Sequence, residues 1–428
     1  MLRRTDRSTV GKVLIVKRVL LLLPVASYRN EDFLAAARKL NVEVIAVADY
    51  CPQLAPGWGM GALSAVHFDQ PLQAAQTILD HLSAAPDAVL AVDDHGLELA
   101  ALLRERLGLA GNAVAAVGLT RDKLAFRHLL QAHGFPCPDF QAVADDADLP
   151  AVARSIHYPV VVKARRLSSS RGVVRANNAG EFITAVRWVR AIQARADREG
   201  PELGVVVESF IPGQEYALEG LLTAGELKVL ALFDKPDPLD GPYFEETIYV
   251  TPSRLPQSMQ ALIVEQVARA CRLAGLSTGP VHAEMRVNQH GVWLLEVAAR
   301  SIGGLCGRML NHALGMSLEE LVLRHALGDS VPDVAARDAA AVMMIPIPKR
   351  GIYRGVHHLD AARAVPHISH IQITAEPGAL LLPAPEGASY LGFIFAQAAS
   401  PQAAERALRE AQRLLRFDIE TEVPLVSV

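Results

Sequence analysis

The stretch VHAEMRVNQHGVWLLEVAARSIGG, residues 281–304, joins two apolar runs through a short polar turn and yet carries two glutamates and two arginines. Side chains alternate between the two faces of a strand, so His282, Glu284 and Arg286 are predicted to share one face. Charged side chains on a buried-looking strand oppose its folding. The fold of this region therefore depends on what neutralises them.

The two runs predict a β-hairpin with the three-residue loop 289–291, whose glycine takes the left-handed position. This loop sets Asn288 opposite Val292 and, counting back, Glu284 directly opposite Glu296. Like charges opposed across strands are destabilising, and two adjacent carboxylates normally share a proton. A divalent cation removes the conflict, and magnesium prefers one or two carboxylates together with substrate phosphates. The alternative is an exposed sheet face with two solvated glutamates.

The same alternation places the remaining side chains of the second run. Glu296, Ala298 and Arg300 are predicted to share a face. The side chains predicted to point away from that face are Trp293, Leu295 and Val297.

Length and composition limit the class of protein. A chain of 428 residues suggests two to four domains, and 51% hydrophobic with 21% charged residues is an ordinary globular balance. The net charge of -4 gives no reason to expect a nucleic-acid partner. The four cysteines form no CxxC pair, which argues against a zinc site or a disulfide framework and fits a reducing compartment. We therefore expect a cytoplasmic protein.

The N-terminal region has two interpretations. Several basic residues precede the apolar run VLLLLPVA (residues 19–26), as in a signal peptide. The following helical and apolar segments instead predict a β-α-β unit, which makes this run a buried first strand. No apolar run reaches the ~18 residues that a membrane helix needs, so we expect no membrane partner.

The order of segments predicts an α/β and α+β multidomain chain. Residues 1–117 alternate strands and helices like a doubly wound α/β unit, residues 118–330 are dominated by strands, and residues 331–428 read as a small α+β unit. In the first unit, strands are expected at 18–25, 42–49, 65–68 and 88–93, with helices at 31–40, 72–84 and 97–107. The proline-rich segment 234–246 is expected to be a loop.

Asp93 and Asp94 follow a predicted strand of the first unit. Ligands of doubly wound folds bind beyond the carboxyl ends of the strands, so these side chains could hold the ammonium group of a substrate. A helix N-cap is the alternative role.

Two lysines are candidates for binding phosphate. Lys123 lies in the first turn of a helix that Thr120 is expected to cap, where the helix dipole disfavours an unpaired cation but favours a phosphate. Lys163 ends the buried-looking strand YPVVVK and therefore needs a partner. The following loop, LSSSRGV (residues 167–173), could fold its amides and hydroxyls over phosphates. The alternatives are a surface lysine at Lys123 and a flexible hairpin tip for the loop.

The segment VVVESFIPGQEYALEGLL (residues 205–222) could bind a nucleoside. An adenine ring needs a hydrogen-bonding backbone edge between apolar side chains, which Glu208 to Ile211 can supply. A ribose needs a carboxylate for its hydroxyls, which Glu215 can supply. The alternative is an ordinary strand–turn–strand.

The order of these signals resembles the ATP-grasp superfamily over roughly residues 19–328. The resemblance implies that Lys123 and Lys163 bind nucleotide phosphates and that residues 168–172 form the mobile loop over them. It further implies an adenine hinge at Glu208 and Ile211, a ribose carboxylate at Glu215, and contact of Arg300 with the transferred phosphoryl group. The predicted loop residues are Ser169, Ser170, Arg171 and Gly172, and the predicted magnesium ligands are Glu284 and Glu296.

One position departs from the superfamily pattern. Most members have asparagine as a third metal ligand two residues after the second glutamate, where this chain has Ala298. The form EVAAR is similar to the L-amino-acid ligase branch, as is the pattern at residues 392–412. The resemblance implies an ATP-dependent carboxylate–amine ligase that joins amino-acid-like substrates through an acyl phosphate and releases ADP and phosphate. It implies ATP and Mg²⁺ as cofactors, with Mn²⁺ as a second candidate, and relatives that are often dimers.

Other functions stay open on the sequence. A carboxylase acting through carboxyphosphate would use the same nucleotide site. Ala298 is the one feature that favours a non-catalytic ATP-binding regulatory protein, and a metal-binding sheet protein without nucleotide is a further alternative. Residues expected near the substrates are His282 and either Glu245 or Glu246.

Overall fold

The computed structural model describes residues 16–25, 27–49, 63, 66–196, 203–332 and 338–421. Its N-terminal unit is a parallel sheet in the order β2-β1-β3. The apolar run forms the central strand, whose residues Val19 to Leu23 are fully buried. The strands are β1 (Arg18–Leu23), β2 (Glu43–Ala48) and β3 (Ala88–Ala91), and the helices are α1 (Asn30–Lys39), α2 (Pro71–His81) and α3 (Leu97–Leu107).

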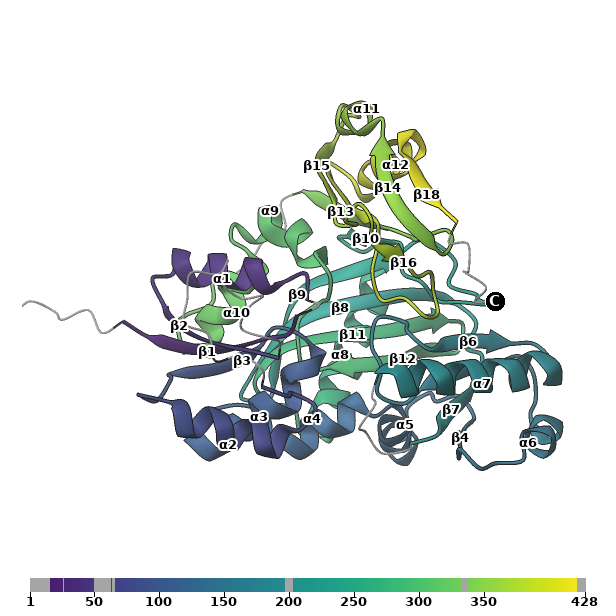
Figure 1. Cartoon of the computed structure of the whole chain (residues 1–428), viewed down its shortest axis with the longest axis horizontal. Coiled ribbons are helices and arrows are strands. Elements are labelled where there is room, and N and C mark those ends of the chain that lie inside the picture. Colours follow the sequence, from purple (N-terminus) through teal and green to yellow (C-terminus); the bar gives the residue numbers. More distant parts are fainter. Residues whose placement is uncertain are drawn as a thin grey trace, which may run out of the picture.

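Alternation along β1 explains the two helical layers of this unit. Leu21 packs in the cluster that contains Phe33 of α1, whereas Leu22 packs with Ile78 of α2 and Leu99 of α3. The helices accordingly lie on both sides of the sheet (Figure 1). This arrangement confirms the predicted buried first strand and the doubly wound α/β unit. The strand expected at 65–68 is not found at residues 66–68, and residue 65 lies outside the described residues.

Two helices connect this unit to the next, α4 (Val114–Arg121) and α5 (Lys123–Ala132). Asp122 caps α5, because its carboxylate accepts hydrogen bonds from the amides of Leu124 at 3.0 Å and Ala125 at 3.3 Å. The prediction that Thr120 caps this helix was wrong. Thr120 lies in the last turn of α4, and its hydroxyl donates to the carbonyl of Val117.

A four-stranded antiparallel sheet follows, in the order β4-β7-β5-β6. The long helix α7 covers it and buries Phe182, Val186 and Val189 against its valines (Figure 1). The elements are β4 (Phe140–Val143), α6 (Leu149–Ser155), β5 (Val160–Ala164), β6 (Val173–Ala176), α7 (Ala179–Ala196) and β7 (Val205–Ser209).

The largest sheet has eight strands in the order β12-β11-β8-β9-β10-β13-β17-β15. Its first part comprises β8 (Gln214–Thr223), β9 (Glu226–Lys235), β10 (Ile248–Thr251), β11 (Gly279–Asn288) and β12 (Gly291–Ala298). Residues 236–246 form no helix or named strand, as their prolines predict. Asp234 and Lys235, which were expected to begin this loop, instead end β9. The helices here are α8 (Gln257–Ala274), η4 (Cys306–Leu310), α9 (Asn311–Leu314) and α10 (Leu318–Ala326). The short helix η3 (Asp94–Gly96) belongs to the N-terminal unit, between β3 and α3.

Strands beyond the predicted boundary at residues 330/331 continue the same large sheet. They are β13 (Ala339–Ile345), β15 (Ile368–Ile373) and β17 (Gly392–Ala398). A separate small sheet contains β14 (Gly351–His357), β16 (Leu380–Leu381) and β18 (Arg416–Glu420). The helices α11 (Leu359–Arg363) and α12 (Pro401–Leu414) lie with these strands (Figure 1). Together the sheets confirm the predicted fold class.

The hairpin of β11 and β12 confirms that Glu284 stands directly opposite Glu296. The predicted loop was wrong, however, because Asn288 pairs with Gly291 across a two-residue turn. A bulge in β12 shifts the register by one residue and so brings the two glutamates opposite each other. Met285 pairs with Leu294, and Leu295 is the extra residue. The prediction that Leu295 points away from Glu296 was also wrong, since both side chains line the same cavity.

None of the helices in the described part of the chain is long and apolar enough to cross a membrane. The three cysteines of that part, Cys137, Cys271 and Cys306, are free thiols.

Candidate active site

One cavity lies between the four-stranded and the eight-stranded sheets, because its walls include residues of β5 and β7 on one side and of β8, β11 and β12 on the other. The predicted residues that line it are Lys123, Lys163, Ser169, Ser170, Glu208, Ile211, Glu215, His282, Glu284, Glu296 and Arg300. Segments separated by up to 177 residues thus meet at one place. Arg171, Gly172, Asp93 and Asp94 are not part of the lining.

Lys163 is held by Glu208 at 2.6 Å, which confirms that this lysine leans on a nearby acid. The same carboxylate accepts two hydrogen bonds from Arg127 of α5, at 2.8 and 3.1 Å. Burial alone would raise the pKa of Glu208, but Arg127 and Lys163 hold it at about 2. Burial lowers the pKa of Lys163, and Glu208 offsets part of this effect. Glu208 is therefore a charged anchor that presents Lys163 to the cavity.

Lys123 begins α5, and its ammonium donates to the carbonyl of Leu167 at 2.6 Å. It thereby contacts Leu167 in the loop that joins β5 to β6. In that loop Ser169 and Ser170 have positive φ angles of 58° and 54°, and Gly172 has φ 68°. Turns that combine left-handed and other residues can aim successive backbone amides at a common point, a geometry suited to anions.

The opposed pair Glu284 and Glu296 faces the cavity, and His282 lies beside it. The His282 ring contacts Glu284 at 3.3 Å and the fully buried Glu219 at 3.1 Å. Burial would lower the pKa of His282, but the two carboxylates raise it to about 9. The donor set of two opposed carboxylates fits a hard divalent cation. Ala298 is buried and offers no ligand atom.

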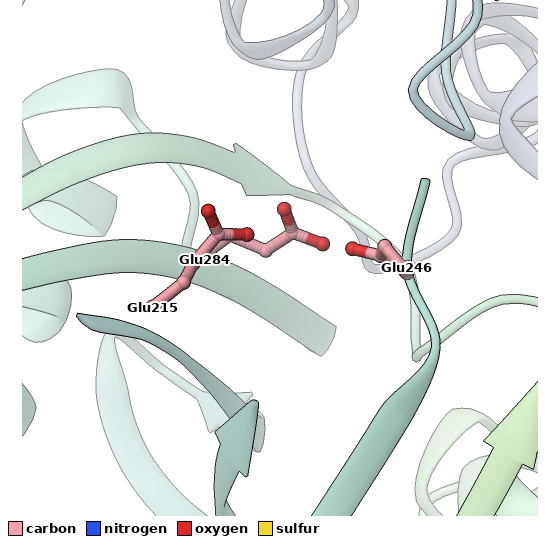
Figure 2. A group of neighbouring side chains, drawn as sticks. All are labelled: Glu215, Glu246 and Glu284. Carbon is pink, nitrogen blue, oxygen red and sulfur yellow. The ribbon is translucent and has the colours of Figure 1, made fainter. Parts of the chain in front are cut away.

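Lys235, at the end of β9, is surrounded by carboxylates. Its ammonium lies 2.5 Å from Glu215, 2.6 Å from Glu246 and 3.6 Å from Glu284. The three carboxyl groups point towards one another (Figure 2), with one oxygen of each within 4.8 Å of the others. Burial opposes the charge of Lys235, but the carboxylates raise its pKa well above the ordinary value.

Arg286 organises the predicted nucleoside end of the cavity. Its guanidinium donates to the carbonyl of Ile211 at 2.8 Å, to the carbonyl of Leu239 and to Glu215 at 3.3 Å. It also lies 5.0 Å from the ring centre of Phe210. One arginine therefore ties together the hinge, the predicted ribose carboxylate and the proline-rich loop.

Arg300 makes an ion pair with Asp94 of the N-terminal unit, at 2.7 Å. Burial would lower the pKa of Arg300, but the charges of Asp94 and its neighbours raise it above the ordinary value. Asp93 accepts a hydrogen bond from the amide of Asp94 at 2.6 Å and caps the short helix η3. Of the two loop glutamates, Glu246 lines the cavity and Glu245 does not. Burial raises the pKa of Glu245 to about 7.

Sequence reasoning missed several charged residues of this site. Lys235 ends an apolar strand as Lys163 does, so the same rule would have found it. Arg286 lies two residues after Glu284 on the same face of β11. The alternation of side chains predicted this position but assigned no role to the arginine. Arg127 follows Lys123 by one helical turn, which places the two on one side of α5. The local sequence pattern marks each of these three residues as unusual. It does not identify their partners, which lie far away in the sequence.

Comparison with known proteins agrees with this geometry. Residues 156–309 match the family model of the ATP-grasp domain, and residues 343–420 match that of the L-amino acid ligase C-terminal domain 2. A D-alanine--D-alanine ligase of Gloeobacter violaceus is 31% identical over 238 residues, which are 52% of this chain and 74% of that protein. The chain belongs to the ATP-grasp family of ligases.

Two further comparisons give the overall fold and a partial sequence match. The chain is similar to the structure of an L-amino acid ligase from Bacillus licheniformis, with a TM-score of 0.77, 24% identity, and coverage of 95% of this chain and 99% of that one. It is also 32% identical to carnosine synthase 1 of Gallus gallus over 245 residues, 54% of this chain. The match spans only 26% of that synthase. The C-terminal domain of the L-amino acid ligases distinguishes this chain within the ATP-grasp ligases.

Proposed function

We propose that the protein uses ATP to join the carboxylate of one amino acid to the amine of a second, through an acyl phosphate, with release of ADP and phosphate. The observation that carries the proposal is one cavity between two sheets that is lined by Lys123, Lys163, Ile211, Arg300 and the opposed pair Glu284 and Glu296. The family model and the C-terminal domain of L-amino acid ligases support it.

In this proposal each part of the cavity has one task. The backbone from Glu208 to Ile211 receives adenine, and Glu215 receives the ribose hydroxyls. Lys163 and Lys123 contact the phosphates under the loop of Ser169 to Gly172. Fixed positive charges aimed at the transferred group stabilise its oxygens without reorganisation.

Glu284 and Glu296 are the proposed ligands for Mg²⁺, and Mn²⁺ fits the same oxygen donors. When bound, the metal neutralises charge that develops on the phosphates. The pair fits this role because two opposed carboxylates offer hard oxygen donors, and Lys235, 3.6 Å from Glu284, offsets only part of their mutual repulsion. Arg300 then contacts the carboxylate that is phosphorylated, and closure of the loop keeps water from the acyl phosphate.

Recognition of the substrates is assigned to the end of the cavity near His282 and Glu246. Both ring nitrogens of His282 are bound, one to Glu219 at 3.1 Å and one to Glu284 at 3.3 Å, so in this proposal His282 acts by holding Glu284 in place beside the substrate. Asp94 is bonded to Arg300 in this structure, and Asp93 to the backbone of η3. A substrate ammonium group that binds Asp93 or Asp94 therefore has to share the carboxylate with these partners.

A matrix of amino acids assayed in pairs for release of ADP and phosphate tests the proposal. We expect turnover only when both a carboxylate donor and an amine acceptor are present. AMP as the stoichiometric product would overturn the acyl-phosphate route. Full turnover with bicarbonate alone would replace the ligase by the carboxylase.

The variant Glu296→Gln tests the assignment of the metal ligands. It removes one of two repelling charges, so the metal-free protein should be at least as stable as the wild type, while Mg²⁺-dependent binding of ATP and turnover are lost. Glu226→Gln, an exposed residue of β9, is the control. Equal melting temperatures and equal Mg²⁺-ATP affinity of Glu296→Gln and wild type would contradict the assignment.

A further inference from the structure

Lys235 has an unusual position for a lysine. It is 2% exposed, and its ammonium lies among Glu215, Glu246 and Glu284, the three-carboxylate cluster. A lysine ammonium is a compact point charge with three N–H donors, and this one faces three carboxylates. A buried ammonium needs such partners, because transfer of an isolated charge from water is strongly unfavourable.

The three-carboxylate cluster needs Lys235 equally. Glu215 comes from β8, Glu284 from β11 and Glu246 from the loop before β10, so separate elements bring the three negative charges together (Figure 2). Without a cation among them the carboxylates would repel one another. Their oxygens are close enough together for one divalent ion to contact all three. The cluster is thus built for a cation, and the chain supplies one.

We infer that Lys235 is a built-in cation that takes the place of a metal ion in the three-carboxylate cluster and positions Glu215 and Glu284 for the nucleotide and metal. A divalent ion cannot enter the cluster beside the ammonium, because two cations would then share one set of oxygens at short distance. A metal at Glu284 is therefore confined to its side that faces Glu296. The buried Ala298 adds no side-chain ligand on that side, so Glu284 and Glu296 are the carboxylates left for the metal.

The inference rests on the proposed function only in naming Glu284 as a metal ligand, and its test needs neither nucleotide nor substrate. Binding of Mn²⁺ is titrated by electron paramagnetic resonance of the free ion, with the protein otherwise unliganded. We expect Lys235→Ala to bind one more Mn²⁺ per chain than the wild type, and the double variant Lys235→Ala/Glu246→Gln to lose that extra ion. Failure of the ligase assay would leave this expectation unchanged.

The matched control is Lys39→Ala, which removes a lysine that pairs with the single carboxylate of Glu320 at 2.7 Å. It should bind the same number of Mn²⁺ ions as the wild type. No gain in Lys235→Ala, or an extra ion that survives in the double variant, would overturn the inference. If Lys235→Ala does not fold, the single variant Glu246→Gln, which keeps Lys235, is titrated with Mn²⁺ instead. Binding equal to that of the wild type supports the built-in cation, because no metal then uses Glu246. Loss of a bound ion refutes it.

Discussion

Glu208 shows how charge is accommodated at the level of single residues. It is buried, and its two oxygens are shared between Arg127 and Lys163. Breaking a buried ion pair by removing one partner leaves an uncompensated charge and typically costs about 3–5 kcal/mol. The carboxylate therefore fixes both the position of Lys163 and the stability of the wall that carries it.

This arrangement predicts a stability that depends on pH. The pKa of Glu208 in the folded protein is about 2, below its ordinary value of 4.5, so its contribution is full above pH 4.5 and is lost as the pH falls through about 2. We expect Glu208→Gln to lower the free energy of unfolding by about 3 kcal/mol at pH 7. Urea unfolding at a series of pH values should show this difference shrinking below pH 4.5. A difference that stays constant down to pH 3 would contradict the assignment.

Lys163 should matter for nucleotide binding. We expect Lys163→Ala to weaken binding of an ATP analogue by roughly 10- to 100-fold, the loss of one charge-assisted contact. The exposed Lys349→Ala serves as the control, and calorimetric titration gives the affinities. Lys123→Ala should fold normally, because its ammonium donates only to the carbonyl of Leu167. Unchanged affinity in Lys163→Ala would leave it a structural lysine.

Among the elements, the bulge in β12 has the clearest effect on the site. Strict alternation would send Leu295 and Glu296 to opposite faces, whereas the extra residue of the bulge lets both line the cavity. The strand thereby presents an apolar side chain next to Glu296, one of the two proposed metal ligands. Leu295 and Ile211 both line this cavity.

A substitution at the bulge separates the nucleoside contact from the metal contact. We expect Leu295→Ala to weaken binding of an ATP analogue about tenfold, because it removes apolar surface worth roughly 1–2 kcal/mol. Mn²⁺ binding without nucleotide should stay as in the wild type, since Glu284 and Glu296 are unchanged. If the affinity for metal fell together with that for nucleotide, the two contacts would not be separable.

The sequence predicted elements better than it predicted their details. Period-2 and period-3.6 patterns are local, so the β-α-β start, the helix α3 and the hairpin of β11 and β12 were found. The bulge has no such pattern, and the correct opposition of Glu284 and Glu296 arose from a wrong loop that the bulge compensated. The cap at Asp122 was missed because the chain forms a separate helix before it. The partners of Lys235 depend on tertiary contacts that no local pattern contains.

At the scale of the whole molecule, buried ion pairs connect the N-terminal unit to the site. Asp94 binds Arg300, while the guanidinium of Arg29 donates to the hydroxyl of Ser301 at 2.7 Å and pairs with Glu319 at 3.2 Å. The segment that begins at Arg300 is therefore held from the N-terminal side. The position of Arg300, which is proposed to contact the transferred phosphoryl group, therefore depends on the N-terminal unit.

The variant Asp94→Asn tests this dependence. We expect kcat to fall about tenfold or more while the KM for ATP is nearly unchanged, since Arg300 loses its charged partner but the nucleotide contacts remain. Asp93→Ala is the comparison: loss of its cap should cost roughly 1 kcal/mol of stability with little change in kcat. A rise in the KM for one amino acid at constant kcat would instead favour Asp94 as the ligand of a substrate ammonium group.

The eight-stranded sheet sets a limit on how the chain can be divided. β10 pairs with β13 along four residues, and the buried Ile248 and Val250 belong to a core shared with the C-terminal strands. A fragment ending at residue 332 would expose this strand as an open, apolar edge, which other copies can extend. We expect such a fragment to form soluble aggregates or inclusion bodies, as judged by size-exclusion chromatography. A monodisperse fragment that still binds an ATP analogue would show that residues up to 332 fold without the C-terminal strands. Aggregation would mean that any exchange of segments between relatives must carry both portions together.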